Sequence, residues 1–195
     1  EYIKAYLRYS KSSLAQEDYR YAIEASLMHG NRNYEELIKN QWPFSERECN
    51  RIVSLVELVR KEKAYERQKE LLELLLVLLE SEYMDSEYNT IYRIVARYRM
   101  GDVLGNLGFH REAIALDEET IRMCEEQQDW RFFSELHYDI FLNYMKISEK
   151  ETLPQQEEVY RKECLLRAYY MGKAMVPDNT LYEKRVLENY QNELL

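Results

Sequence analysis

Glycine and proline are scarce in this sequence, with five Gly and three Pro among 195 residues. Because these two residue types most often interrupt a helix, the chain offers few places for a helix to break. The rest is rich in Leu, Glu, Arg, Lys and Tyr, and no stretch alternates apolar and polar residues as a half-buried strand does. The composition therefore predicts an all-α protein.

Cysteine is scarce too, and no long apolar run is present. Cys49, Cys124 and Cys164 are odd in number and far apart, so they indicate neither a disulfide framework nor a zinc knuckle. Cys124 and Cys164 lie in apolar helical stripes, and we expect them to be buried and unreactive. The longest apolar run, residues 74–79, is far shorter than the roughly 20 residues of a membrane span, and no secretory signal opens the chain. We expect a cytoplasmic protein.

The sequence also lacks an excess of basic residues, because its 27 Lys and Arg are outnumbered by 36 Asp and Glu, which gives a net charge of −9. Affinity for a phosphate backbone comes largely from Lys and Arg that displace counterions. We therefore expect no direct contact of this chain with nucleic acid. Residue 1 is Glu and not Met, which suggests a piece of a longer protein.

Motifs for catalysis and metal binding are missing from the sequence. There is no GxSxG turn, no Cys–His neighbourhood and no phosphate-binding Gly loop. A di-iron carboxylate site needs Glu-x-x-His pairs, but the residues three positions before the three His are Ser26, Leu107 and Ser134. We expect no enzymatic activity, metal or cofactor. The alternative, a helical enzyme, would need several perturbed carboxylates that converge in one pocket.

Local signals divide the chain into helices. Capping boxes that begin helices start at Ser13, Ser45 and Thr180, Gly30 and Gly108 mark helix ends, and Pro43, Pro154 and Pro177 stand near other boundaries. Between these signals apolar residues recur with the period of a helix. The pattern predicts helices at about 2–11, 16–29, 32–41, 46–62, 65–83, 87–106, 110–127, 130–148, 155–174 and 180–193.

Residues 94–121, with the core YRMGDVLGNLGFHREAIALDEETI, resemble a tetratricopeptide repeat. Gly101 and Ala113 stand at the small positions where two helices cross closely, and Gly108 stands at the turn. Asp117 and Thr120 depart from the pattern, which prefers an aromatic residue and Ala there, and the closing Pro is absent.

The same frame places further repeats at irregular spacing, with first helices from Cys49, Ile94 and Ser134. We predict one domain over residues 1–195, a right-handed α-solenoid of antiparallel helical hairpins, with a compact helical bundle as the alternative. Its parts are N-terminal helices at 1–44, hairpins at 45–84, 87–127 and 130–175, and a capping helix at 180–195.

A broader resemblance covers about three-quarters of the chain. The order of EASLMHGNRNYEELIKN, the repeat, and LLRAYYMGKAMVPDNTLYEKRVLENY resembles the C-terminal sensor half of bacterial XRE-type helix-turn-helix transcription regulators. The resemblance implies a DNA-binding domain before residue 1. In peptide-sensing members of that group, a short signalling peptide lies in the concave groove of such repeats.

Within the repeat frame, nine residues take the groove-facing positions of the first helices. They are Val53, Glu57, Arg60, Tyr98, Asp102, Asn106, Tyr138, Leu142 and Met145. Amide and carboxylate groups suit a peptide backbone, and Tyr, Leu and Met suit its side chains. The alternative is that Tyr98 and Tyr138 pack between helices and that the polar members are solvated.

We expect a ligand-sensing regulatory domain of a transcription regulator, which binds a peptide or partner protein in its groove. The alternative is a tetratricopeptide-type interaction scaffold without a switch. The terminal helix carries an apolar stripe. This stripe could form the interface of a homodimer, or it could cap the last hairpin. The stripe consists of Tyr182, Val186, Leu187, Tyr190 and Leu194.

Overall fold

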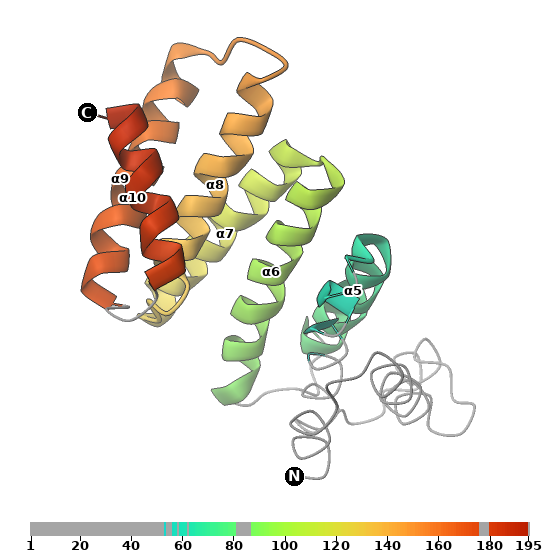
Figure 1. Cartoon of the computed structure of the whole chain (residues 1–195). Helices are drawn as coiled ribbons and strands as arrows, with labels where there is room; N and C mark the ends of the chain where they lie inside the picture. Colours follow the sequence, from blue (N-terminus) through green and yellow to red (C-terminus); the bar gives the residue numbers. More distant parts are fainter. Residues whose placement is uncertain are drawn as a thin grey trace, which may run out of the picture. The chain divides into compact units, whose positions relative to one another are not determined.

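The computed structural model describes residues 53, 56–57, 59–61, 63–80, 87–175 and 180–194. Throughout these residues the regular structure is helical, which confirms the all-α prediction (Figure 1). The helices are α5 (Tyr65–Glu80), α6 (Glu87–Leu107), α7 (His110–Gln127), α8 (Phe133–Ser148), α9 (Gln155–Met175) and α10 (Thr180–Leu194). The chain forms two compact units, Glu1–Ala96 and Arg97–Leu195, and their boundary falls within α6.

The helix ends lie close to the predicted positions because local chemistry sets them. Gly108 follows α6 with φ +88°, a left-handed conformation that suits glycine, and the Phe109 amide donates to the Leu104 carbonyl at 2.9 Å. Pro154 directly precedes α9, and α10 begins at Thr180. The predicted signals at Ser13, Gly30, Pro43, Ser45 and Pro177 lie outside the described residues.

In the first unit, α5 carries the long leucine run. Leu71, Leu72, Leu75 and Leu79 are all buried, whereas Val77 is 48% exposed, so the run has one solvent-facing side. A turn precedes the helix at Lys63, where φ is 56° and the Ala64 amide donates to the Val59 carbonyl.

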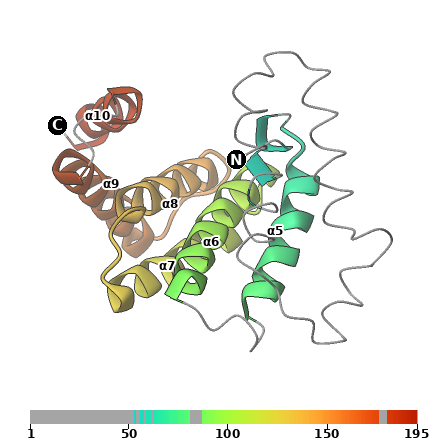
Figure 2. The same ribbon diagram turned by 90° about the horizontal axis from the view of Figure 1, so that it is seen from below.

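In the second unit, helices pack in the order in which the chain makes them. Short connections make neighbours antiparallel, and α7 packs on α8, α8 on α9, and α9 on α10 (Figure 2). The core between them includes Leu136, Ile140 and Phe141 of α8 and Leu165 and Ala168 of α9, none of which is exposed. This apolar packing holds the second unit together.

The close approach of α6 and α7 depends on Gly101, as the repeat pattern indicates. The carboxyl of Asp117 lies against Gly101, and a Cβ on this glycine would overlap Asp117 Oδ1. Asp117 and Thr120, the two departures from the repeat pattern, are both fully buried, and the Thr120 hydroxyl donates to the Leu116 carbonyl at 2.8 Å. The missing side chain at Gly101 thus leaves room for the Asp117 carboxyl.

The terminal helix α10 covers the last hairpin through its own apolar and polar contacts. Val186 is buried, and the Tyr190 ring stacks on Tyr169 of α9 with centroids 4.2 Å apart. Arg161 of α9 pairs with Glu193 at 2.8 Å. These contacts favour the capping role of the stripe; the homodimer stays a prediction. Among the described residues, no helix is long and apolar enough to cross a membrane.

Candidate functional site: a pocket lined by α6, α7 and α8

A pocket of about 490 Å³ lies in the second unit, where the C-terminal part of α6 and the start of α7 face α8. Four of the ten lining residues carry a carboxylate or an amide. The full lining is Asp102, Gly105, Asn106, Leu107, Gly108, His110, Asp139, Leu142, Asn143 and Lys146. The pocket is large enough for several side chains of a ligand and offers both polar and apolar contacts.

Hydrogen bonds hold the amides of this pocket in place. Asn106 donates through Nδ2 to the carbonyl and the carboxylate of Asp102, at 2.7 and 3.0 Å. Asn143 donates through Nδ2 to the Asp139 carbonyl at 2.9 Å, and its Oδ1 lies 2.9 Å from His110 Nδ1. Because an amide oxygen only accepts, this last bond requires the proton on Nδ1 of His110. The bond joins the start of α7 to α8 across the pocket wall.

Glycine 105 allows Asn143 to reach this position. A Cβ at Gly105 would lie 2.8 Å from Asn143 Oδ1, closer than side chains tolerate without movement. The glycine therefore leaves room for the amide on the facing helix.

Asp139 is the most strongly perturbed titratable group that lines the pocket. Burial raises its pKa to about 8, and the nearby carboxylates of Asp102 and Glu135 add to the shift, while Arg99 opposes it. An aspartate in such a setting holds its proton near neutral pH and gains from an approaching cation.

Asp117 lies behind this pocket in electrostatic contact with it. Burial raises its pKa well above the usual range, and Asp139 and Asp102 are the next causes in order. Its side chain is fully buried, and neither carboxyl oxygen has a hydrogen-bond partner. Three helices of the second unit thus each bring one aspartate to the same region.

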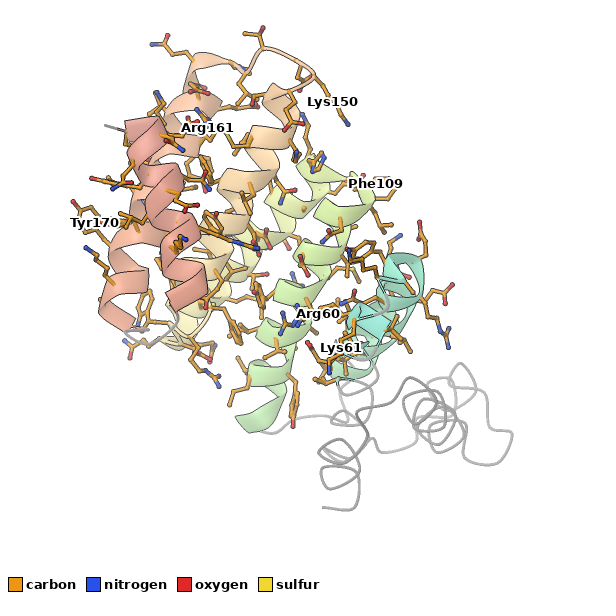
Figure 3. The ribbon with its side chains drawn as sticks, in the orientation of Figure 1. Arg60, Lys61, Phe109, Lys150, Arg161 and Tyr170 are labelled. Atoms are coloured by element: carbon orange, nitrogen blue, oxygen red, sulfur yellow. The ribbon has the colours of Figure 1, made fainter. Side chains whose placement is uncertain are left out.

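A second pocket of about 330 Å³ adjoins the first, because Gly108 and His110 line both. Phe109, which is 43% exposed, and Lys150 belong to this second pocket (Figure 3). Its Arg111 is ion-paired with Glu151 and Glu157. The two pockets thus share the α6–α7 turn.

The main pocket brings together three of the nine residues predicted for the groove: Asp102, Asn106 and Leu142. Tyr98 lies one turn before Asp102 on α6, where its ring stacks on Phe132 with centroids 4.9 Å apart. Burial and the neighbouring Asp139 raise the pKa of its hydroxyl. Tyr98 therefore packs between elements of the second unit, as the alternative interpretation expects.

Tyr138 and Met145 of α8 do not line the pocket. The Tyr138 hydroxyl accepts a hydrogen bond of 2.8 Å from Asn189 Nδ2 of α10, and Met145 contacts the guanidinium of Arg161. The residues directly after them, Asp139 and Lys146, do line it. Since one residue turns a helix by about 100°, the α8 face that meets the pocket is rotated by one position from the predicted face.

The remaining predicted positions, Val53, Glu57 and Arg60, belong to the first unit. Val53 is half-buried, and Arg60 Nε donates to Glu57 Oε2 at 3.1 Å. The two charged residues thus pair with each other.

Sequence reasoning did not select Gly105, Leu107, Gly108, His110, Asp139, Asn143 or Lys146 for this site. On α8 a usable signal was present: Asp139, Leu142, Asn143 and Lys146 recur at i, i+3, i+4 and i+7. Residues at this spacing lie on one face of a helix.

The part of the chain that the structure describes shows neither a group of metal ligands nor a reactive cysteine. No group of three or more His, Cys, Asp and Glu is placed there to hold a metal ion. Cys124 and Cys164 are buried free thiols, and burial raises their pKa to about 11 and about 12. Thiols with such pKa values are poor nucleophiles near neutral pH.

Comparisons of the chain with protein-family models, with curated proteins and with solved structures give no match.

Proposed function

We propose that this chain is a ligand-sensing regulatory domain that binds a short peptide in the pocket lined by α6, α7 and α8. The observation that carries the proposal is the meeting of Asp102, Asn106 and Leu142 in one pocket, because three positions chosen for peptide contact on two separate helices line the same space. Such a pocket offers carboxylate and amide groups to a backbone and a leucine to a side chain.

The geometry of the polar groups supports a pocket that is formed before the ligand arrives. Asn106 and Asn143 are oriented by bonds within their own helices, and His110 connects α7 to α8. A binding site with positioned groups loses less conformational entropy when it is filled. The second pocket, with the exposed ring of Phe109, extends the same surface beyond the α6–α7 turn.

The link to transcription follows from the sequence resemblance to XRE-type regulators. In this proposal the helical hairpins form a solenoid, and the occupied pocket changes the balance between two arrangements of its helices. The size of that shift cannot exceed the difference in ligand affinity between the two arrangements. This part of the proposal requires a helix-turn-helix domain before residue 1 in the full gene product.

The test is a titration of the 195-residue chain with pools of synthetic hexapeptides, followed by thermal shift and calorimetry. Leu142→Ala and Asn106→Ala are each expected to weaken binding about tenfold, since each removes one contact worth about 1.4 kcal/mol. Leu166→Ala is the matched control, because Leu142 and Leu166 are both 38% exposed but Leu166 does not line the pocket. Peptide pools that produce no thermal or calorimetric response would refute the proposal.

A second candidate, an interaction scaffold without a switch, is favoured by the outer face of α9. Val159, Leu166 and Tyr170 recur at i, i+7 and i+11 on one face and are 58%, 38% and 57% exposed. Tyr170 extends away from α9 in Figure 3. Small-angle scattering of the free and peptide-bound chain separates the two functions, because a switch changes the radius of gyration on binding and a scaffold leaves it unchanged.

A further inference from the structure

We propose that the buried carboxyl of Asp117 acts as a pH-sensitive switch at the crossing of α6 and α7. The neutral carboxyl keeps the two helices packed, and its ionisation separates them. This inference concerns the fold of the second unit and does not rest on the proposed peptide ligand. It starts from two observations: the carboxyl lies directly against Gly101, and its oxygens have no hydrogen-bond partners.

The Asp117 carboxyl occupies the space that a side chain at position 101 would fill. A Cβ on Gly101 would lie 2.1 Å from Asp117 Oδ1 and 2.9 Å from its Cγ, so the carboxyl lies against the backbone of α6. Asp117 has no exposed surface. Water can therefore hydrate this carboxyl only if α6 and α7 move apart at the crossing.

The surroundings of Asp117 favour the neutral form of its carboxyl. Neither oxygen forms a hydrogen bond with the described residues, and a buried carboxylate without partners is much less stable than one in water. The charged groups that act on it are the carboxylates of Asp102 on α6, Glu118 on α7 and Asp139 on α8. Arg99 of α6 acts in the opposite sense on Asp139. Burial, the largest cause, and the three carboxylates raise the pKa of Asp117 well above its usual range.

The sign of the pH dependence follows from these two states of the crossing. When the helices are apart, the hydrated carboxyl should have the ordinary aspartate pKa of about 3.9. When they are packed, the pKa of Asp117 is raised, so between these two values the packed state binds one more proton. The ratio of open to packed crossing should therefore rise about tenfold for each unit of pH in this range, and level off above the raised pKa.

Opening of the crossing would also reach the pocket. Asp102 follows Gly101 directly along α6, and Asp102 and Asn106 line the pocket together with residues of α8. Movement of α6 away from α7 would therefore change the spacing of the pocket walls. The switch thus makes the shape of the pocket depend on pH, whichever ligand fills it.

The experiment uses the 195-residue chain labelled with 15N-glycine, because five glycines give a simple amide spectrum. Exchange of the Gly101 amide is measured across roughly pH 5–9 and corrected for the intrinsic effect of pH, so that it reports opening of the helix. The corrected rate of the unsubstituted chain should rise about tenfold per pH unit up to the raised pKa of Asp117. Asp117→Asn keeps the shape of the side chain without the charge, and should lose most of this rise.

Two further variants separate Asp117 from the other carboxylates. Glu126→Gln, the matched control, removes an exposed carboxylate from the same helix and should keep the full rise. Asp139→Asn should keep the rise but end it at a lower pH, because one of the charges that raise the pKa of Asp117 is gone. A rise that is lost in Asp139→Asn and kept in Asp117→Asn would overturn the proposal.

A second measurement needs no variant and decides the matter even if Asp117→Asn unfolds. The carboxyl carbon of Asp117, labelled with 13C in the unsubstituted chain, changes its chemical shift when the group ionises. Its titration midpoint should lie well above the ordinary aspartate range. A midpoint near the ordinary value would show that the packed crossing accepts the charged carboxylate, and the switch would be refuted.

Discussion

Asp139 lines the pocket, and burial, together with the carboxylates of Asp102 and Glu135, raises its pKa to about 8. In the unfolded chain an aspartate has a pKa near 3.9. Between these two values the folded state binds more protons than the unfolded state, so the free energy of unfolding falls as pH rises from about 4 to about 8. Burying the Asp139 carboxyl thus lowers the free energy of unfolding as the pH rises toward about 8.

Asp139→Asn should therefore raise the free energy of unfolding at pH 8 by roughly 1–3 kcal/mol, since an amide carries no charge to bury. At pH 4, where the native carboxyl is protonated, the gain should be near zero. Urea unfolding at several pH values measures both, with Glu163→Gln as the control for a simple change of charge. A residual slope is expected because the buried Asp117 shares the raised pKa. An equal effect at both pH values would contradict this explanation.

Gly101 and Asp117 form a complementary pair at the crossing of α6 and α7. Gly101→Ala should lower the free energy of unfolding by about 1–3 kcal/mol, the usual cost of overpacking, because the new methyl overlaps a buried carboxyl. The double variant with Asp117→Ala should recover this loss, since it removes the overlapping atoms. A double-mutant cycle by chemical denaturation measures the coupling, and additive effects of the two changes would show that the pair is not in contact.

At the scale of elements, α10 is held by a small set of polar contacts around one buried arginine. The Arg161 side chain is 7% exposed and pairs with Glu158 at 2.6 Å and with Glu193 of α10 at 2.8 Å. Its guanidinium also lies 5.6 Å from the centre of the Phe141 ring. One side chain of α9 thus contacts both α8 and α10, which makes it one of the links between the last three helices.

Arg161→Ala should release α10 before the other helices of the second unit. Removing one partner of a buried ion pair lowers the free energy of unfolding by about 3 kcal/mol at the lower end of the usual range. The lower end applies here because the carboxylates of Glu158 and Glu193 are both partly exposed. Hydrogen exchange of the α10 amides is expected to speed up, while the amides of α7 remain protected. Lys162→Ala is the matched control, since Lys162 is exposed and its ammonium lies 3.8 Å from Glu158 Oε1. Uniform acceleration in all helices would indicate general destabilisation.

At the scale of the whole molecule, the negative net charge of this chain disfavours direct contact with the DNA that the proposed regulator would control. With a net charge of −9, the chain has no excess of the basic residues that phosphate contacts require. An electrophoretic mobility shift with duplex DNA at low salt should therefore show no complex for the 195-residue chain, with or without peptide. A salt-sensitive complex would contradict the assignment of DNA contact to another domain.

For the helices from α5 to α10, the sequence by itself determined where they begin and end, because helix ends depend on neighbours along the chain; the helices predicted at 2–11, 16–29 and 32–41 lie outside the described residues. Gly108 and Thr180 predicted an end and a start from backbone conformation and capping, and Gly101 predicted a close helix crossing from the size of its side chain. These signals act within a few residues or on one property of a residue, so they can be read without a fold.

Only the tertiary structure decided which helix faces meet. On α8 the stripe at the pocket is turned by one residue from the predicted one, which exchanges Tyr138 for Asp139 and Met145 for Lys146. The burial of Asp117 and the raised pKa of Asp139 likewise depend on side chains from other helices. A helix in an amphipathic sequence can rotate by tens of degrees at little local cost, so packing against its neighbours sets the final angle and with it the residues of the site.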